Sequence, residues 1–188
     1  MAGQQFRLLR RRRFGPFFAT QALGAFNDNV FKNALVILVA FQLPGLSGAQ
    51  VDFYSNLAAG LFILPFFLFS ALAGQWAERQ EKARAIRRIK LLEIAIMAAA
   101  ALALWLKSLP LLLAVLFLTG VQSALFGPLK YSILPQALRP RELVGGNALV
   151  EAGTFLAILL GTMLGGWLMN VPGHGPLLTG VAVLGLAV

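Results

Sequence analysis

Residues 27–32 read Asn-Asp-Asn-Val-Phe-Lys, and they lie deep inside an otherwise apolar stretch that runs from about Phe17 to Leu43. Insertion scales place Asp or Lys at the centre of a membrane helix at about +2.5 to +3.5 kcal/mol each. A membrane helix retains such residues where they face a protein interior or a wet cavity, and there they usually bind or move something. This stretch therefore predicts a membrane helix that carries a functional site.

The two charges in this stretch are spaced to interact. Asp28 and Lys32 are four residues apart, so they share one helix face and can partly neutralise each other. One interpretation is a structural ion pair that locks the packing of helices. The other, which we favour, is a substrate or ion site.

The composition is that of an integral membrane protein. Of the 188 residues, 59% are hydrophobic and 12% are charged, and the mean hydropathy is +0.78. Soluble domains carry about 25% charged residues. The chain has no cysteine, which excludes disulfides and thiolate metal sites, and its single histidine, His174, lies in a turn rich in Pro and Gly. We therefore expect no metal site and no cofactor.

The net charge of +9 would fit a nucleic-acid binder, but its distribution argues against one. Basic residues fill alternate connections between the apolar segments, whereas the remaining connections hold only Lys107. This positive-inside pattern predicts a cytoplasmic N-terminus and a topology signal rather than a nucleic-acid site. The clusters are Arg7, Arg10, Arg11, Arg12 and Arg13, then Arg79, Lys82, Arg84, Arg87, Arg88 and Lys90, and last Arg139 and Arg141.

Six apolar segments follow a basic tail at residues 1–16, which we expect to be cytoplasmic. Each segment is near the roughly 20 residues that span hydrocarbon, and Pro-containing turns separate several of them. The last segment stops in mid-run at Val188, so we expect a chain truncated at its sixth helix. The transmembrane domain is then 17–188, with helices at about 17–43, 52–76, 88–106, 110–134, 146–169 and 175–188.

Polar residues concentrate on the first, fourth and fifth segments. These three helices should line an interior, while the third and sixth should face lipid. A polar helix with its counterpart three helices later is typical of a three-plus-three inverted repeat. For Lys130 the alternative is snorkelling to the interface, and for Glu151 it is a charge near a helix N-terminus. The candidate binding residues are Asp28, Asn29, Lys32, Gln122, Lys130, Tyr131 and Glu151.

Small residues recur every fourth position on the fifth segment, at Gly153, Ala157, Gly161 and Gly165. Such spacing lets a neighbouring helix approach closely, so it predicts a packing seam rather than a site.

The connection after the second segment carries a family motif. Residues 74–84 read Gly-Gln-Trp-Ala-Glu-Arg-Gln-Glu-Lys-Ala-Arg and resemble the signature loop of the major facilitator superfamily, with Glu78 in place of the more usual Asp. The resemblance implies an all-α membrane protein in which this chain is the N-terminal six-helix half. It also implies a cytoplasmic gate network formed by Gly74, Glu78, Arg79, Lys82 and Arg84.

Three further stretches are similar to bacterial lysophospholipid transporters: residues 20–29, 126–135 and 146–166. They begin Thr-Gln-Ala-Leu-Gly-Ala-Phe-Asn-Asp-Asn, Phe-Gly-Pro-Leu-Lys-Tyr and Gly-Asn-Ala-Leu-Val-Glu-Ala-Gly-Thr. Lys32 departs from the simpler members and looks closer to the branch fused to acyltransferase and acyl-activating domains.

This resemblance implies inward movement of lysophospholipids, such as lysophosphatidylethanolamine, across the bacterial inner membrane. Lys130 and Lys32 could meet the phosphate with help from Tyr131, and Asp28 and Glu151 the amine. The acyl tail could lie in an apolar groove lined by Phe62, Phe66, Phe67 and Phe69. The expected partners are the bilayer, a lysophospholipid or another amphipathic small molecule, and the C-terminal half of the transporter.

Two other functions stay open. The same fold serves proton-coupled exporters of drugs or metabolites, in which Asp28 would carry the proton. The chain could also be the membrane module of a fused acyltransferase, although it contains no His-x4-Asp pair, nucleophile elbow or nucleotide loop of its own. We therefore expect no enzyme within these residues.

Overall fold

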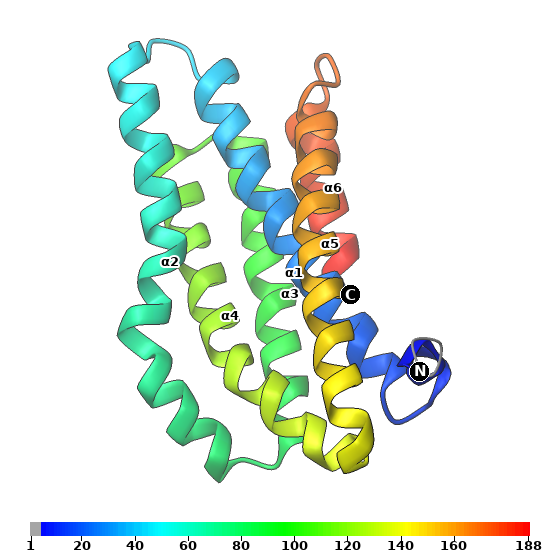
Figure 1. Ribbon diagram of the computed structural model, residues 1–188. Coiled ribbons are helices and arrows are strands. Elements are labelled where there is room, and N and C mark those ends of the chain that lie inside the picture. Colours follow the sequence, from blue (N-terminus) through cyan, green and yellow to red (C-terminus); the bar gives the residue numbers. More distant parts are fainter. Residues whose placement is uncertain (1–4) are drawn as a thin grey trace.

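The computed structural model describes residues 5–188 and is a bundle of long helices (Figure 1). Every regular element in this part of the chain is helical, which confirms the all-α prediction. The elements are η1 (Gln5–Arg10), α1 (Gly15–Ile37), η2 (Leu38–Gln42), α2 (Gly48–Arg79), α3 (Lys82–Leu106), α4 (Leu109–Ala137), η3 (Pro140–Glu142), α5 (Leu143–Met169) and α6 (Gly175–Ala187).

The second and third helices are longer than their apolar segments. α2 starts at Gly48, where Ser47 and Gln50 form a capping box that satisfies free backbone N–H groups. α3 starts at Lys82 because the Glu81 carboxylate accepts hydrogen bonds from two N–H groups of its first turn. The connection between them is therefore Gln80 and Glu81 alone, and most of the signature motif is helical.

By length and composition, four helical stretches of the described chain could cross a membrane: Gly48–Arg79, Lys82–Leu106, Leu109–Ala137 and Pro140–Met169. α1 is not among them although it has 23 residues, because its Asn, Asp and Lys side chains lower its hydropathy. α6 has 13 residues. α1 is thus the helix that depends most on protein neighbours.

The helices pack in a pattern that repeats. α1 packs most closely against α5, α2 against α4 and α3 against α6, with further contacts of α3 with α4 and of α1 with α6. Exchanging the first three helices with the last three maps each of these pairs onto another pair or onto itself. This is the arrangement that a three-plus-three repeat produces.

The predicted small-residue seam is the α1–α5 interface. A Cβ added at Gly161 would lie 2.4 Å from the carbonyl oxygen of Phe26, and one added at Gly165 would lie 2.5 Å from that of Val30. The two backbones are therefore too close for any larger residue.

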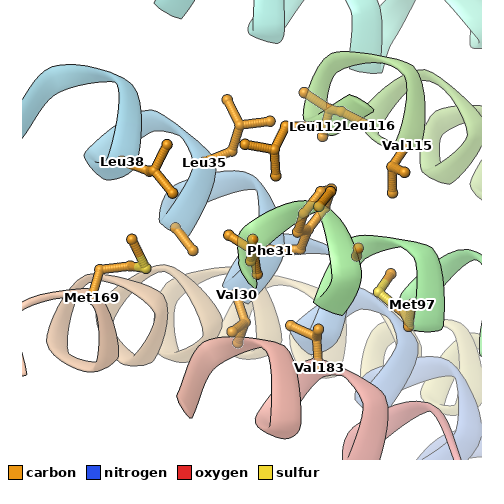
Figure 2. Close-up of a cluster of buried hydrophobic side chains, with 14 of the residues drawn as sticks. Val30, Phe31, Leu35, Leu38, Met97, Leu112, Val115, Leu116, Met169 and Val183 are labelled. Atoms are coloured by element: carbon orange, nitrogen blue, oxygen red, sulfur yellow. The ribbon is translucent and has the colours of Figure 1, made fainter. Parts of the chain in front are cut away.

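The main apolar core lies among α1, α3, α4 and α6 (Figure 2). Phe31 and Leu35 of α1 pack with Met97 of α3 and Leu116 of α4, and all four side chains are fully buried. Between helices in lipid, such contacts stabilise through close packing rather than through removal from water. This core holds α1 in place around its polar residues.

Three segments lie at the same end of the bundle: the N-terminal segment, the α2–α3 connection and the α4–α5 connection (Figure 1). Residues 1–4 of the expected tail lie outside the described residues, but the rest of the tail is folded. Leu8 and Phe14 are buried in a cluster with Leu138 and Val150. Next to them, guanidinium nitrogens of Arg11 and Arg13 lie 2.7 and 2.5 Å from the Glu142 carboxylate.

Candidate functional site

A cavity of about 430 Å³ lies among helices α1 to α5. Five predicted binding residues line it, whereas Lys32 and Glu151 do not. The lining residues are Thr20, Gln21, Gly24, Ala25, Asp28, Asn29, Phe62, Phe66, Lys90, Glu93, Gln122, Ser123, Phe126, Gly127, Lys130, Tyr131, Thr154 and Ile158.

Asp28 is only 7% exposed and is bound by a hydroxyl rather than by a lysine. Its Oδ2 accepts a hydrogen bond from Ser123 Oγ at 2.6 Å, and its Oδ1 has no hydrogen-bond partner among residues 5–188. Ser123 was not predicted, because a single Ser among apolar residues gives no signal in the sequence. An unpartnered buried carboxylate oxygen is costly unless a ligand supplies a donor.

The structural ion pair between Asp28 and Lys32, which was the interpretation we did not favour, does not form in the described structure. The ammonium of Lys32 lies instead 5.1 Å from the centroid of the Phe62 ring. The two side chains do share a helix face, but the ring face offers the longer side chain a cation–π partner on α2.

The third helix also lines the cavity, so the prediction that it faces lipid is wrong. Glu93 is 2% exposed; its Oε1 lies 2.7 Å from Lys90 Nζ, and its Oε2 accepts from Gln122 Nε2 at 3.0 Å. Because α3 begins at Lys82 rather than near residue 88, Glu93 lies about 17 Å from the helix start. Because the sequence pattern did not predict the N-cap at Glu81, it did not predict that the Glu93 carboxylate is buried either.

These groups form one polar chain across three helices. Ser123 Oγ lies 2.6 Å from Asp28 Oδ2 and 3.2 Å from Gln122 Oε1, and Gln122 donates in turn to Glu93. Lys90 ends the chain on α3. Two buried carboxylates on different helices are thus connected through two neighbouring residues of α4.

A second charged group lies on the α4–α5 side of the cavity. Lys130 Nζ lies 3.5 Å from Glu151 Oε1 and 3.4 Å from Thr154 Oγ1, and 4.9 Å from the centroid of the Tyr131 ring. The Tyr131 hydroxyl donates to the same Glu151 carboxylate. With its side chain only 13% exposed, Lys130 does not extend to the surface as the snorkelling alternative requires.

The remaining wall is apolar. Phe62 and Phe66 of α2 face the cavity together with Phe126 of α4. The expected aromatic groove is smaller than predicted, since Phe67 is 79% exposed and neither it nor Phe69 lines the cavity. The cavity thus combines an aromatic wall with two buried carboxylates and two partly buried lysines.

The predicted gate residues cluster at the basic end but form no network of their own. Glu78, Arg79 and Arg84 are exposed, and no ion pair within the described chain involves them. Lys82 donates to the carbonyl oxygen of Ala77 at 2.5 Å and so caps the end of α2.

Hydrogen bonds from backbone N–H groups of Arg84 and Ala83 hold the pKa of Glu81 below its usual range. Gly74 lies within α2, and a Cβ there would meet no atom within 4 Å.

Other places in the described structure offer less chemistry. No group of three or more His, Cys, Asp or Glu residues between residues 5 and 188 could hold a metal ion. A cavity of about 530 Å³ lies where α3 ends and α5 turns into α6, and its charged lining residue, Lys107, is exposed.

A helical bundle with membrane-length apolar helices and an internal charged cavity defines a multi-pass membrane protein. Residues 17–188 match the sequence model of the Major Facilitator Superfamily, and the chain belongs to that family.

The chain is also similar to curated proteins named lysophospholipid transporter LplT. Those of Salmonella arizonae and Serratia proteamaculans are each 31% identical to it over 150 residues, which is 80% of this chain and 35% of theirs. That of Yersinia enterocolitica is 30% identical over 150 residues, covering 80% and 34%. The chain spans about a third of the length of these relatives. No solved structure matches it.

Proposed function

We propose that this chain is part of a transporter that moves lysophospholipids, such as lysophosphatidylethanolamine, inward across a bacterial inner membrane by alternating access. Support comes from the family, from the names of the relatives and from the chemistry of the cavity. The observation that carries the proposal is the unpartnered Oδ1 of buried Asp28, in a cavity that also has an aromatic wall and a partly buried lysine, Lys130.

The charges and hydrogen-bonding groups of such a lipid headgroup complement those that line this cavity. Its ammonium carries a positive charge and N–H donors. Asp28 Oδ1 and Asn29 Oδ1 are buried acceptors to which no group in residues 5–188 donates, so the ammonium would supply the hydrogen bonds that they lack. Its phosphate needs a cation, and Lys130 of α4, which also lines the cavity, would supply one. In this proposal Gln122 supports the amine side through Glu93.

The roles of Tyr131 and Glu151 follow from their contact. Both hold the ammonium of Lys130, one through its ring and the other through its carboxylate. We assign them to positioning Lys130 for phosphate, and we no longer assign Glu151 to the amine. Lys32, which lies over Phe62, is a neighbour of the tail-binding wall rather than a phosphate ligand.

The proposed orientation places the basic end of the bundle in the cytoplasm. Residues 1–16 would lie at that surface and residues 17–188 would form the transmembrane domain. Glu78, Arg79 and Arg84, exposed and without an ion pair within residues 5–188, would be free there to pair with the other half of the transporter. Gly74 and Lys82 would shape the same gate.

One observation favours a second function, the proton-coupled export of a drug or metabolite. Asp28 is bound by the neutral hydroxyl of Ser123 and not by a lysine, so its carboxyl group can accept a proton without breaking an ion pair. In that case an imposed proton gradient should drive an aqueous solute.

An uptake assay in proteoliposomes that contain the full-length protein distinguishes lysophospholipid transport from proton-coupled export. Labelled lysophosphatidylethanolamine is added outside, and albumin then extracts whatever remains in the outer leaflet. We expect the albumin-resistant fraction to rise faster than in protein-free vesicles. A rate equal to that of protein-free vesicles would refute lysophospholipid transport, and solute export driven by the gradient would favour the exporter.

A further inference from the structure

Two charged side chains in and around the cavity have no ionic partner in the part of the chain that the structure describes. They are Asp28 and Lys32, which lie one turn apart on α1. The other charges there form ion pairs, Lys90 with Glu93 at 2.7 Å and Lys130 with Glu151 at 3.5 Å. One carboxylate and one ammonium of opposite charge thus remain, and their spacing along the helix lets them reach each other.

The Lys32 ammonium has two alternative partners. In the structure it lies 5.1 Å from the centroid of the Phe62 ring, and Asp28 Oδ1 has no hydrogen-bond partner among residues 5–188. An Asp and a Lys four residues apart on a helix can also pair directly, and the change between the two positions needs only side-chain rotation. α2 has no acidic residue between Phe53 and Ala77, so no carboxylate of that helix competes with Asp28 near Phe62.

We infer that Lys32 is an exchangeable counterion: it pairs with Asp28 in the empty transporter and moves onto the Phe62 ring when the ammonium of a ligand takes Asp28. This inference rests on the proposed lysophospholipid function. It gives Lys32 a role in the transport cycle that is separate from the phosphate contact of Lys130.

The exchange keeps the Asp28 carboxylate paired with a cation throughout the cycle. A buried carboxylate without a cation is strongly unfavourable, so an empty cavity with Asp28 unpaired would be costly to close and to carry back across the membrane. Pairing with Lys32 removes that cost from the return step. Ligand binding then replaces one ammonium by another, while the face of the Phe62 ring receives the displaced one. Lys32 thus serves the return of the empty transporter rather than the binding of ligand.

A comparison of net uptake with exchange tests this role. Net uptake requires the empty transporter to return, whereas exchange of external for internal ligand does not. The full-length protein is placed in phosphatidylcholine vesicles, whose quaternary headgroups carry no N–H donor, and labelled lysophosphatidylethanolamine is added outside. For exchange, the vesicles also contain unlabelled lysophosphatidylethanolamine, and albumin extraction measures the protected label in both cases.

Lys32→Met removes the counterion and keeps an apolar side chain of similar length. We expect net uptake to slow by about tenfold or more, while exchange stays within about threefold of the wild-type rate. Lys32→Arg keeps a cation and should retain net uptake. Lys107→Met, at an exposed lysine that does not line this cavity, should leave both rates unchanged.

Three results would overturn the inference while wild-type uptake leaves the proposed function intact. An equal fall of net uptake and exchange in Lys32→Met would make Lys32 structural. Unchanged net uptake in this variant would show that Asp28 needs no counterion from Lys32, and loss of net uptake in Lys32→Arg would show that the positive charge is not what matters. Failure of the wild-type protein in both assays overturns the function and the inference together.

Discussion

Asp28 combines burial, one hydroxyl partner and one unpartnered oxygen, so its charge should matter for ligand binding more than for folding. We expect Asp28→Asn in the full-length protein to abolish or strongly reduce lysophosphatidylethanolamine uptake. Loss of a hydrogen bond to a charged group costs about 1.5–3 kcal/mol, which is roughly 10- to 150-fold in affinity. Normal uptake by a well-expressed variant would make Asp28 structural.

Ser123 should act as a positioning residue. Its hydroxyl fixes Asp28 Oδ2 at 2.6 Å and so directs the other oxygen to the ligand. We expect Ser123→Ala to raise the half-saturation concentration about tenfold with little change in maximal rate, since the loss falls on binding. Ser123→Thr retains the hydroxyl and should restore the wild-type value. A fall in maximal rate alone would contradict this role.

The close approach of α1 and α5 predicts that a Gly→Ala substitution in this interface lowers stability, whereas one at an open position of α2 does not. Gly161→Ala places a Cβ 2.4 Å from a backbone oxygen, so we expect a loss of about 1–3 kcal/mol from overpacking, seen as a lower melting temperature in detergent. Gly60→Ala on α2 meets no atom within 4 Å and should be neutral or stabilising. Equal effects of the two substitutions would argue against the seam.

The N-cap of α3 should weaken in acid. Glu81 has a lowered pKa in the folded state, so its stabilisation is complete above the unfolded pKa of about 4.3 and is lost as the pH falls through the folded value. We expect hydrogen exchange at the amides of Ala83 and Arg84 to accelerate at low pH relative to interior α3 amides. Glu81→Ala should exchange fast at every pH, and an unchanged pH profile in this variant would contradict the assignment.

Helix existence could be predicted from the sequence better than helix limits and side-chain partners. Apolar runs and proline breaks indicated six helices, and the spacing of small residues predicted a packing seam on α5 but not that its partner is α1. The depth of Glu93 was missed because the N-cap at Glu81 extends α3 through a charged stretch. The partner of Asp28 was missed because spacing along one helix says nothing about a hydroxyl on another.

The arrangement of charged connections predicts the orientation of the bundle. Residues 1–188 hold no cysteine, so a single cysteine introduced among them is the only thiol that this stretch offers to a labelling reagent. We expect cysteines at Ser47 and His174 to react with an impermeant reagent from the periplasmic side, and one at Gln80 only from the cytoplasm. Labelling of the first two from the cytoplasm alone would reverse the proposed topology.

The pairing of α1 with α5 also bears on how the protein is made. Asn33 on α1 donates its amide hydrogen to the carbonyl oxygen of Thr162 at 2.7 Å, across 129 residues of chain. Among the six α-helices of the described chain, α1 is synthesised before the others, although it is the least able to enter lipid by itself, and its main neighbour α5 follows only after three other helices. Until α5 emerges from the ribosome, we expect the insertion machinery to shield the polar face of α1 from lipid. α1 would then become stable in the bilayer only late in biogenesis.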